Sequence, residues 1–406
     1  MLNRVIIKNF FSFHGENTII LNKGVNLLLG INGSGKTSFI NALRLLFEGI
    51  SENSKLEDLI QAQWGGFDQI ANCNGKEKSD TIQITYVFDC ESVNKYNSWQ
   101  PFHSDIFYQI TIHPLGNTDY HLDEKIFTKK ADDSDSPFIF LDFHNGKGKL
   151  STRTEEEVIQ LLEYDNNDFG GGHELVLKRI TDPIHYLPLH TLHRAIEAMS
   201  VYNSFDTGET SPLRKLSPYS TGTRLWKNGE NLTQILNYLC NSHSLDFDKI
   251  EEILHKVNQT YKNIHIDNVN GQAYLTLREK NLNKAIGALH LSDGTLRFLL
   301  LESIFLNPER GKLVAIDEPE RGLHPDMIKA VSDMIKNAAK DSQLIIATHS
   351  PQLLNQFTLE DILVFEKNEE NTTVVKPISE DDFPEDKDCS LPGLLWLNGE
   401  IGGKRW

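Results

Sequence analysis

The sequence predicts an α/β protein with a mixed, largely parallel core sheet, an antiparallel β subdomain and a helical insertion. Short runs that are apolar almost throughout, near both ends of the chain, indicate strands buried on both faces, as in a parallel sheet. These runs lie at residues 25–29, 313–316, 344–347 and 362–365. Alternation of apolar and polar residues between 81 and 150 indicates antiparallel strands. Between 155 and 257 the apolar residues recur at helical spacing.

The elements fall into three segments, of which the first, residues 1–150, forms an N-terminal lobe. Short β-branched runs at 5–7 and 18–21 predict two strands, and the apolar run at 25–29 predicts a third. A glycine-rich loop follows, and a helix begins near Thr37. The alternating strands after residue 81 then form the antiparallel subdomain.

The second segment, residues 151–264, is expected to be a mostly helical insertion. Apolar residues at i, i+3, i+4 and i+7 predict one helix over 232–239 and another over 247–257. The third segment, residues 265–406, returns to strand–helix alternation and forms a C-terminal lobe. The α/β core is therefore discontinuous, and the insertion separates its two parts.

Composition excludes several classes of protein. The 406 residues carry 40 basic and 57 acidic side chains, a net charge of −17, which excludes a uniformly basic nucleic-acid-binding domain. The four cysteines are scattered, which argues against a disulfide framework or a cysteine-based zinc site. No apolar run is long enough for a membrane span and the N-terminus does not resemble a signal peptide, so we expect a cytoplasmic protein with no membrane partner.

The glycine-rich loop between the third strand and its helix matches the pattern GxxxxGK[ST] at every fixed position. Its glycines allow backbone N–H groups to surround a phosphate, and the helix N-terminus adds its dipole. Lys36 is placed for the β- and γ-phosphates and Thr37 for Mg²⁺. The candidate nucleotide-binding residues are Asn32, Gly33, Ser34, Gly35, Lys36, Thr37 and Ser38.

Two carboxylates end the apolar strand at 313–316. Asp317 suits a Mg²⁺ partner of Thr37, and Glu318 suits a catalytic residue that polarises an attacking water. By itself such a strand end would equally suit a capped turn. Its pairing with the phosphate-binding loop favours the catalytic interpretation.

Two further motifs bear on phosphate chemistry. Ser292 and Gly294 open a predicted helix and form a second phosphate-binding nest. His349 follows the strand at 344–347, at the strand end where ligands of open α/β sheets bind, and could reach a γ-phosphate.

These four motifs, in this order, resemble the ATPase heads of the ABC superfamily, in the branch that contains RecF and the SMC proteins. The resemblance implies ATP and Mg²⁺ as cofactors. It makes residues 30–37 the Walker A loop, Asp317 and Glu318 the Walker B pair, and His349 the switch histidine. Residues 292–294 stand for the signature motif and depart from the transporter form. Residues 320–324 occupy the place of the D-loop, and the opening segment 7–13, which also resembles this branch, runs close to the nucleotide in it.

The family's Q-loop glutamine, a further Mg²⁺ ligand, has two candidates here, Gln61 and Gln63. We favour Gln63, although no motif separates the two.

A narrower resemblance covers nearly the whole chain. Segments 212–214, 229–232, 292–297 and 395–403 are similar to a group of single-chain bacterial ATPases related to RecF. This group includes ATPase subunits of anti-phage defence systems such as Septu and PARIS, and the ATPase half of OLD-family nucleases. No nuclease domain fits the remaining residues, which implies a separate effector, by this resemblance a nuclease.

One copy of each motif implies that two chains complete each other's sites, as a head-to-tail homodimer or a higher even-numbered oligomer with bound ATP. We therefore expect an ATPase that regulates a separate effector in anti-phage defence. The alternative is a RecF-like repair ATPase that binds DNA without a toxic effector. Small basic clusters would line its DNA groove, namely 178–179, 214–215, 224 with 227, and 404–405. A transporter ATPase is disfavoured by the antiparallel subdomain and the helical insertion.

Overall fold

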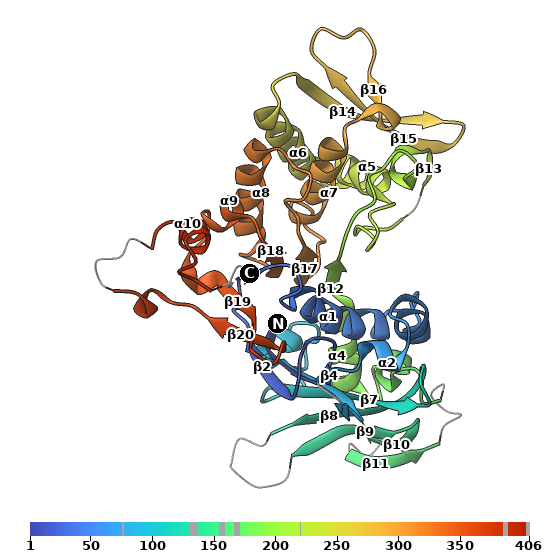
Figure 1. Ribbon diagram of the computed structural model, residues 1–406. Coiled ribbons are helices and arrows are strands. Elements are labelled where there is room, and N and C mark those ends of the chain that lie inside the picture. The colour runs from blue at the N-terminus through green and yellow to red at the C-terminus, as the bar shows by residue number, and fades with distance from the viewer. Residues whose placement is uncertain are drawn as a thin grey trace.

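The computed structural model describes residues 1–74, 77–129, 137–153, 159–165, 171–219, 221–384 and 389–402. Two large sheets face each other across a layer of helices, and a second helical layer covers the other face of the core sheet (Figure 1). A small third sheet extends beyond this second helical layer (Figure 1). The fold is therefore a mixed α/β architecture, as predicted.

The core sheet has six strands in the order β12-β17-β18-β3-β19-β20. The first five run parallel and β20 is antiparallel to β19. The strands are β3 (Val25–Leu29), β12 (Met199–Tyr202), β17 (Leu313–Asp317), β18 (Gln343–Thr348), β19 (Ile362–Lys367) and β20 (Thr373–Pro377). The four buried strands predicted near the two ends of the chain are confirmed, and the N-terminal one lies between two C-terminal ones.

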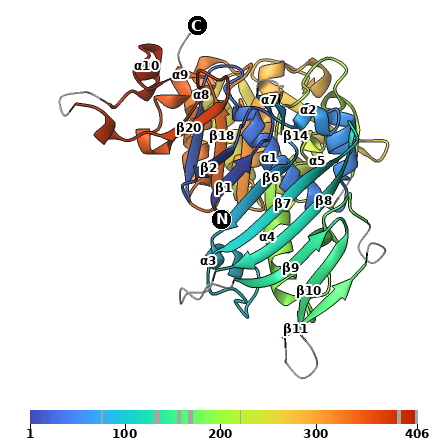
Figure 2. The ribbon, with the colours of Figure 1, turned by 60° about the horizontal axis from the view of Figure 1, so that its bottom comes forward.

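The second sheet has eight strands in the order β11-β10-β9-β8-β7-β6-β1-β2, all antiparallel (Figure 2). They are β1 (Leu2–Lys8), β2 (Glu16–Ile20), β6 (Ile82–Phe88), β7 (Ile106–Leu115), β8 (Asp119–Thr128), β9 (Phe138–His144), β10 (Lys147–Arg153) and β11 (Ile159–Tyr164). The antiparallel subdomain predicted after residue 81 is confirmed, and the two N-terminal strands extend it.

Helices α1 (Lys36–Ile50) and α4 (Leu187–Glu197) lie between the two sheets (Figure 1). Alternate residues of the core strands point to opposite layers. Ala315 and Ile345 pack in the cluster that contains α1, whereas Val314 and Ile346 pack in the other cluster. The second layer consists of α5 (Leu232–Ser242), α6 (Ser244–Val257), α7 (Asp293–Phe305) and α8 (Pro325–Ala338). Burial on both faces explains why the core strands are mostly apolar.

The third sheet is built on the hairpin of β14 (Tyr261–Val269) and β15 (Gln272–Glu279), to which β13 (Ser217–Pro218) and β16 (Ile286–Gly287) add. The shorter remaining elements are α2 (Phe67–Ile70), α3 (Cys90–Asn94), α9 (Pro351–Leu354), α10 (Pro392–Leu397), the strand pair β4 (Cys73–Asn74) and β5 (Glu77–Lys78), and a π-helix over Asp58–Gln63. Single 3₁₀ turns span Val176–Arg179, Pro212–Arg214, Ala288–His290, Leu359–Asp361 and Glu380–Asp382. No helix in the described ranges is both long and apolar enough to cross a membrane.

The structure differs from the prediction in two regions. Within 155–257, expected to be mostly helical, β11 joins the antiparallel sheet and β12 joins the core sheet. Both are short and owe their conformation to neighbouring strands, which periodicity within one segment does not reveal. After residue 261, a hairpin replaces the expected strand–helix alternation, and it turns at Asn270-Gly271, both with positive φ. The division at residues 150 and 264 stays a prediction.

One buried carboxyl gives a prediction about stability. Glu302 of α7 is fully buried, and neither of its carboxylate oxygens has a hydrogen-bond partner among the described residues. Burial raises its pKa well above the usual value. In the unfolded chain it ionises near pH 4.5. The folded state therefore loses stability as pH rises above that value, by up to about 1.4 kcal/mol per pH unit until the folded pKa is reached.

We therefore expect Glu302→Met to raise the free energy of unfolding, and to raise it more at pH 8 than at pH 5. Urea denaturation of wild type and variant at both values measures this difference. Glu309→Met, at an exposed position, changes the net charge equally and serves as the control. An equal effect of Glu302→Met at both pH values would contradict the prediction.

Candidate nucleotide-binding and catalytic site

The predicted phosphate-binding loop joins the end of β3 to the start of α1, at the carboxyl edge of the core sheet. Gly33 and Gly35 have φ values of 80° and 110°, which favour glycine. A Cβ atom on Gly35 would lie 2.3 Å from Thr373 Oγ1 and 2.8 Å from Ser12 Oγ. Only glycine fits this position without displacing the groups beneath the loop.

Those groups form a hydroxyl cluster that supports the loop. Thr373 Oγ1 donates to the Ser34 carbonyl oxygen at 2.9 Å and lies 2.7 Å from Ser12 Oγ. Ser12 Oγ lies 3.0 Å from Ser38 Oγ at the start of α1. Sequence reasoning named Ser34 and Ser38 but missed Thr373, which comes from β20. Ser12 belongs to the opening segment that the family resemblance placed near the nucleotide.

The side chain of Lys36 folds back over the phosphate-binding loop. Its Nζ donates to the carbonyl oxygens of Gly30 at 2.6 Å and Ile31 at 3.1 Å. Burial lowers the pKa of this ammonium, and the nearby Asp317 and Glu318 carboxylates partly oppose that shift. The site therefore holds a desolvated cation on backbone acceptors that phosphate oxygens can replace.

Thr37 and Asp317 meet at the end of β17. Thr37 Oγ1 donates to Asp317 Oδ2 at 3.2 Å, although the two residues are remote in sequence. Burial raises the pKa of Asp317, as does the neighbouring Glu318, against the effects of Thr37 and Lys36. A hydroxyl and a carboxylate oxygen are ligands that Mg²⁺ prefers, so these two residues fit such an ion.

Glu318 and His349 also meet, across β17 and β18. His349 Nδ1 lies 3.1 Å from Glu318 Oε1, and both side chains are partly exposed. Glu318 has a φ of 49°, and its N–H donates to the Ala347 carbonyl oxygen at 2.9 Å. A non-glycine residue in this left-handed backbone conformation costs of order 1–3 kcal/mol of folding free energy. It persists where surrounding contacts hold it, often at functional sites.

Glu320 supports this edge from within. Its Oε1 accepts from Thr348 Oγ1 at 2.5 Å and from the His349 N–H at 3.4 Å. Burial raises its pKa, and its second oxygen has no partner among the described residues. Glu320 belongs to the segment predicted as the D-loop. Its hydrogen bonds fix the end of β18 and thereby the backbone of His349.

A cleft of about 280 Å³ opens beside the carboxylates, and Thr37, Asp317 and Glu318 line it. Arg297 of α7 and Arg321 of the predicted D-loop line the same cleft. Burial lowers the pKa of Arg297, and Arg321 lowers it further. The two arginines add positive charge to the cleft that the carboxylates also line. Sequence reasoning assigned neither residue, because no motif brings their positions together.

The predicted signature loop lies at the start of α7, where Ser292 caps the helix by accepting from the Thr295 N–H at 3.1 Å. The Ser292 hydroxyl also lies 2.7 Å from Thr295 Oγ1. A Cβ atom on Gly294 would lie 3.1 Å from the Gly322 carbonyl oxygen, so the loop packs closely on the D-loop. Ser292 itself is exposed, with no contact to Lys36 or Thr37 among those described.

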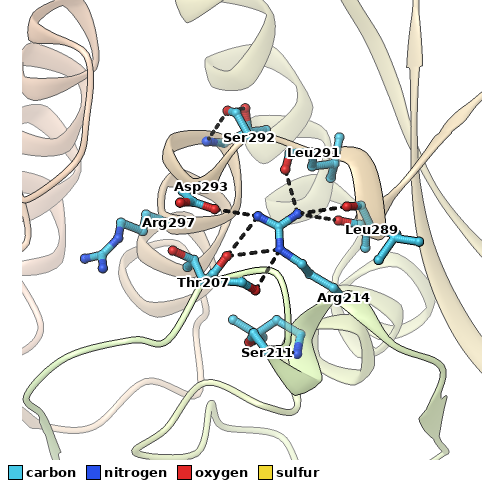
Figure 3. A network of polar contacts seen from close by, with 12 residues as sticks. Thr207, Ser211, Arg214, Leu289, Leu291, Ser292, Asp293 and Arg297 are labelled. Carbon is cyan, nitrogen blue, oxygen red and sulfur yellow. Dashed lines mark hydrogen bonds and ion pairs between the residues drawn. The ribbon is translucent and has the colours of Figure 1, made fainter.

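Arg214 holds this loop from behind (Figure 3). Its guanidinium is 5% exposed and donates to the carbonyl oxygens of Ala288, Leu289 and Leu291 at 3.0, 3.2 and 2.7 Å. It also pairs with Asp293 Oδ1 at 2.5 Å and donates to the Thr207 and Gly208 carbonyl oxygens. Arg297, one turn further along α7, points away from these contacts (Figure 3).

This burial corrects one interpretation of the sequence. The sequence suggests that Arg214 belongs to a basic cluster lining a DNA groove, but the structure buries its side chain. Lys178 pairs with Glu174 at 2.7 Å, and Lys227 pairs with the buried Glu48 at 2.7 Å. These side chains hold the fold together, and the cluster at 404–405 lies outside the described residues.

The two Q-loop candidates make other contacts. Gln63 Oε1 accepts from Arg44 Nη2 at 2.8 Å, and Gln61 Nε2 donates to Asp119 Oδ1 at 3.0 Å. The contacts described bring neither glutamine to Thr37 or Asp317. The role of Gln63 as a Mg²⁺ ligand stays a prediction.

Known proteins resemble this chain in sequence. It is 32% identical over 97 residues to the DNA replication and repair protein RecF of Acetivibrio thermocellus, covering 24% of this chain and 26% of RecF. It is 38% identical over 61 residues to the DNA double-strand break repair Rad50 ATPase of Thermoplasma acidophilum, covering 15% and 7%. The chain thus spans about a quarter or less of these two relatives. It is 22% identical over 383 residues to the Retron Vc95 probable ATPase of Vibrio cholerae, covering 88% and 72%.

Solved structures resemble it in fold. An SMC head bound to the C-terminal winged-helix domain of ScpA superposes with a TM-score of 0.59 at 13% identity, covering 94% of this chain and 98% of the head. An SMC head domain from Pyrococcus furiosus with an extended coiled coil gives 0.57 at 12% identity, covering 98% and 99%. These likenesses establish an SMC-head fold.

Two family models match the chain. The model described as "AAA ATPase domain" matches residues 1–171. The model described as "AAA domain, putative AbiEii toxin, Type IV TA system" matches residues 127–355, more than half of the chain. The chain therefore belongs to this AAA-domain family, and it is RecF-like in part of its sequence and SMC-like in its fold.

Proposed function

We propose that this protein hydrolyses ATP with Mg²⁺ in a head-to-tail homodimer, in which each chain supplies the signature loop for its partner's nucleotide. The contact between Thr37 and Asp317, next to Glu318 and Lys36, carries the proposal. It supports the proposal because a hydroxyl, two carboxylates and an ammonium lie at one edge of the sheet, and Mg²⁺-dependent hydrolysis of ATP uses these groups.

The chemistry follows from these positions. The backbone N–H groups of the loop and Lys36 bind the phosphates, and Lys36 exchanges its carbonyl partners for phosphate oxygens. Thr37 and Asp317 would hold Mg²⁺, which neutralises charge on the phosphates when bound. Glu318 orients the attacking water and accepts its proton, while His349 holds the Glu318 carboxylate in place.

The proposed contribution of the second chain depends on the exposure of the signature loop. Ser292 and Asp293 are exposed at the N-terminus of α7, which favours negative charge. Within one chain the hydroxyl of Ser292 contacts Thr295 and not the loop at Lys36. A second chain that approaches this face would receive the Ser292 hydroxyl and the helix N-terminus at its own γ-phosphate.

Mixing two inactive variants tests this arrangement. Lys36→Ala disables the phosphate-binding loop and Ser292→Arg blocks the signature loop, so each should abolish turnover alone. Half of the dimers in an equal mixture would contain one of each chain and one fully intact site. The mixture should therefore regain about a quarter of the wild-type rate. No recovery on mixing, with both variants folded, would exclude sites shared between chains.

We further propose that ATP turnover regulates a separate effector in anti-phage defence. The supporting observation is the likeness over 88% of this chain to a retron ATPase. The protein should be purified together with the products of its neighbouring genes, as wild type and as Glu318→Gln. A co-purifying nuclease whose activity differs between the two preparations is the expected result, and a chain that purifies alone would contradict it.

The second candidate is a DNA-binding repair ATPase, which the short matches to RecF and Rad50 favour. It predicts ATP-dependent binding to duplex DNA that weakens steeply with salt. Against it, Arg214 is buried, and Lys178 and Lys227 are paired with carboxylates, so these three side chains are less available to phosphate groups. Absence of binding at low salt with ATP present would eliminate it.

A further inference from the structure

A cluster of histidines lies on the antiparallel sheet, on strands that the proposed ATPase mechanism does not use. His113 of β7 stands directly opposite His121 of β8, and Asp123 of β8 stands opposite His144 of β9. His121 and Asp123 are two residues apart on one strand, so their side chains share a face. Strands β7, β8 and β9 lie side by side in the antiparallel sheet (Figure 2). Their register brings three histidines and an aspartate to neighbouring positions.

The distances within this cluster are short. Asp123 Oδ2 lies 3.0 Å from His113 Nε2 and 2.9 Å from His144 Nδ1. One donor atom each from His113, His121 and Asp123 lies within 4.8 Å of the others. In the part of the chain that the structure describes, this is the one group of three such side chains so close together.

One atom in the cluster lacks a partner within the protein. His121 Nδ1 is buried and makes no hydrogen bond among the described residues. The His121 ring instead stacks on His113, with centroids 4.7 Å apart and planes at 7°. A buried ring nitrogen without a partner costs free energy, which a bound ion would recover. This atom is therefore a second and independent sign of a ligand.

We propose that His113, His121, Asp123 and His144 bind a transition-metal ion, with Zn²⁺ as the best fit. Imidazole nitrogen with one carboxylate oxygen is a donor set suited to Zn²⁺ and its neighbours, whereas Mg²⁺ and Ca²⁺ prefer oxygen alone. The site is distinct from the Mg²⁺ pair at Thr37 and Asp317, and it contains no cysteine.

Two of the separations between donor atoms already suit a tetrahedral ion. Ligand atoms about 2.0–2.1 Å from Zn²⁺ lie about 3.3 Å from one another. The pairs that Asp123 makes with His113 and His144 are already close to this separation. For its Nδ1 to face the same ion, the His121 ring would have to turn out of its stack with His113. The imidazoles bind as neutral ligands, so they release any proton that they share with Asp123.

An ion here would cross-link β7, β8 and β9 near the turn between β7 and β8. That turn packs on α2, because the N–H groups of Phe67 and Asp68 donate to the carbonyl oxygens of Thr118 and Asn117. Gln61, in the preceding π-helix, donates to Asp119 at the start of β8. The metal would therefore fix the ends of β7 and β8 that contact α2 and the π-helix after α1.

Cobalt binding to the full chain tests the proposal, with the protein first treated with EDTA, dialysed and kept free of nucleotide. Co²⁺ should bind one per chain with the intense visible absorption of a four-coordinate site, and Zn²⁺ should displace it. His121→Gln and Asp123→Asn should each weaken Co²⁺ binding at least roughly tenfold. Zn²⁺ should also raise the melting temperature of wild type and not of these variants.

His185→Gln is the matched control, because His185 forms an isolated, exposed pair with Asp182 at 2.6 Å. Its Co²⁺ affinity should equal that of wild type. His144→Gln, at a side chain that is 71% exposed, keeps the test available if His121→Gln does not fold. Weak absorption typical of six-coordinate Co²⁺, binding unchanged in the variants, or a thiolate-to-cobalt band from a cysteine would each overturn the proposal.

Discussion

Replacing Glu318 with glutamine should slow ATP turnover by roughly two to four orders of magnitude and leave ATP binding intact. The carboxamide keeps the shape of the side chain and can still contact His349, which lies 3.1 Å from the carboxylate. It cannot accept a proton from the attacking water. Phosphate release measured under saturating ATP reports the loss, and fluorescent-nucleotide binding reports the retained affinity.

The same variant should accumulate the ATP-bound dimer, because the nucleotide that joins the two chains is not consumed. Light scattering coupled to size-exclusion chromatography, with and without ATP, measures this accumulation. Glu309→Gln changes an exposed carboxylate on the loop after α7 and should behave as wild type. Turnover within a few-fold of wild type in Glu318→Gln would remove Glu318 from the catalytic role.

The second large effect is expected at Arg214, which we place as a positioning residue for the signature loop. Arg214→Met leaves the Asp293 carboxylate and the carbonyl oxygens of Ala288 and Leu291 without their buried partner. Each buried carbonyl oxygen left without a donor typically costs about 1–3 kcal/mol, and several such losses together are enough to release this loop. We expect turnover to fall at least roughly a hundredfold and the ATP-dependent dimer to disappear.

Nucleotide binding to the single chain separates positioning from general unfolding. The loop at Lys36 lies on another element, so ADP should bind Arg214→Met with an affinity close to that of wild type. Arg214→Lys restores a charge without the planar fork and should recover only part of the turnover. Lys215→Met, at the exposed neighbouring residue, is the control. Lost ADP binding in Arg214→Met, or full turnover, would contradict the assignment.

The parts of the site that the sequence predicts are those written as continuous motifs at strand ends. The loop up to Thr37 and the carboxylates after β17 each follow an apolar strand, and parallel strands bring their carboxyl ends to one edge. The contact between Thr37 and Asp317 follows from that rule. The buried strands and the antiparallel subdomain were predictable for the same reason, since their periodicity lies within each segment.

The missed parts depend on pairing between distant segments. Thr373 supports the phosphate-binding loop only because β19 lies beside β3 and β20 beside β19. The sequence likewise suggested a surface role for Arg214, which the loop at 288–293 buries. The cluster at His113 and Asp123 requires the register of three strands, which alternating residues alone do not fix.

The position of β3 in the core sheet also sets the order in which the protein can fold. Leu27 of β3 pairs with Ile346 on one side and Ile362 on the other, so both neighbours are translated last. Such distant contacts fold slowly, because a long loop must close before any pairing is gained. Until β18 and β19 have been translated, β3 is an apolar strand without a hydrogen-bonding neighbour on either side. We therefore expect the nascent chain to depend on chaperones, and truncations before β18 to aggregate.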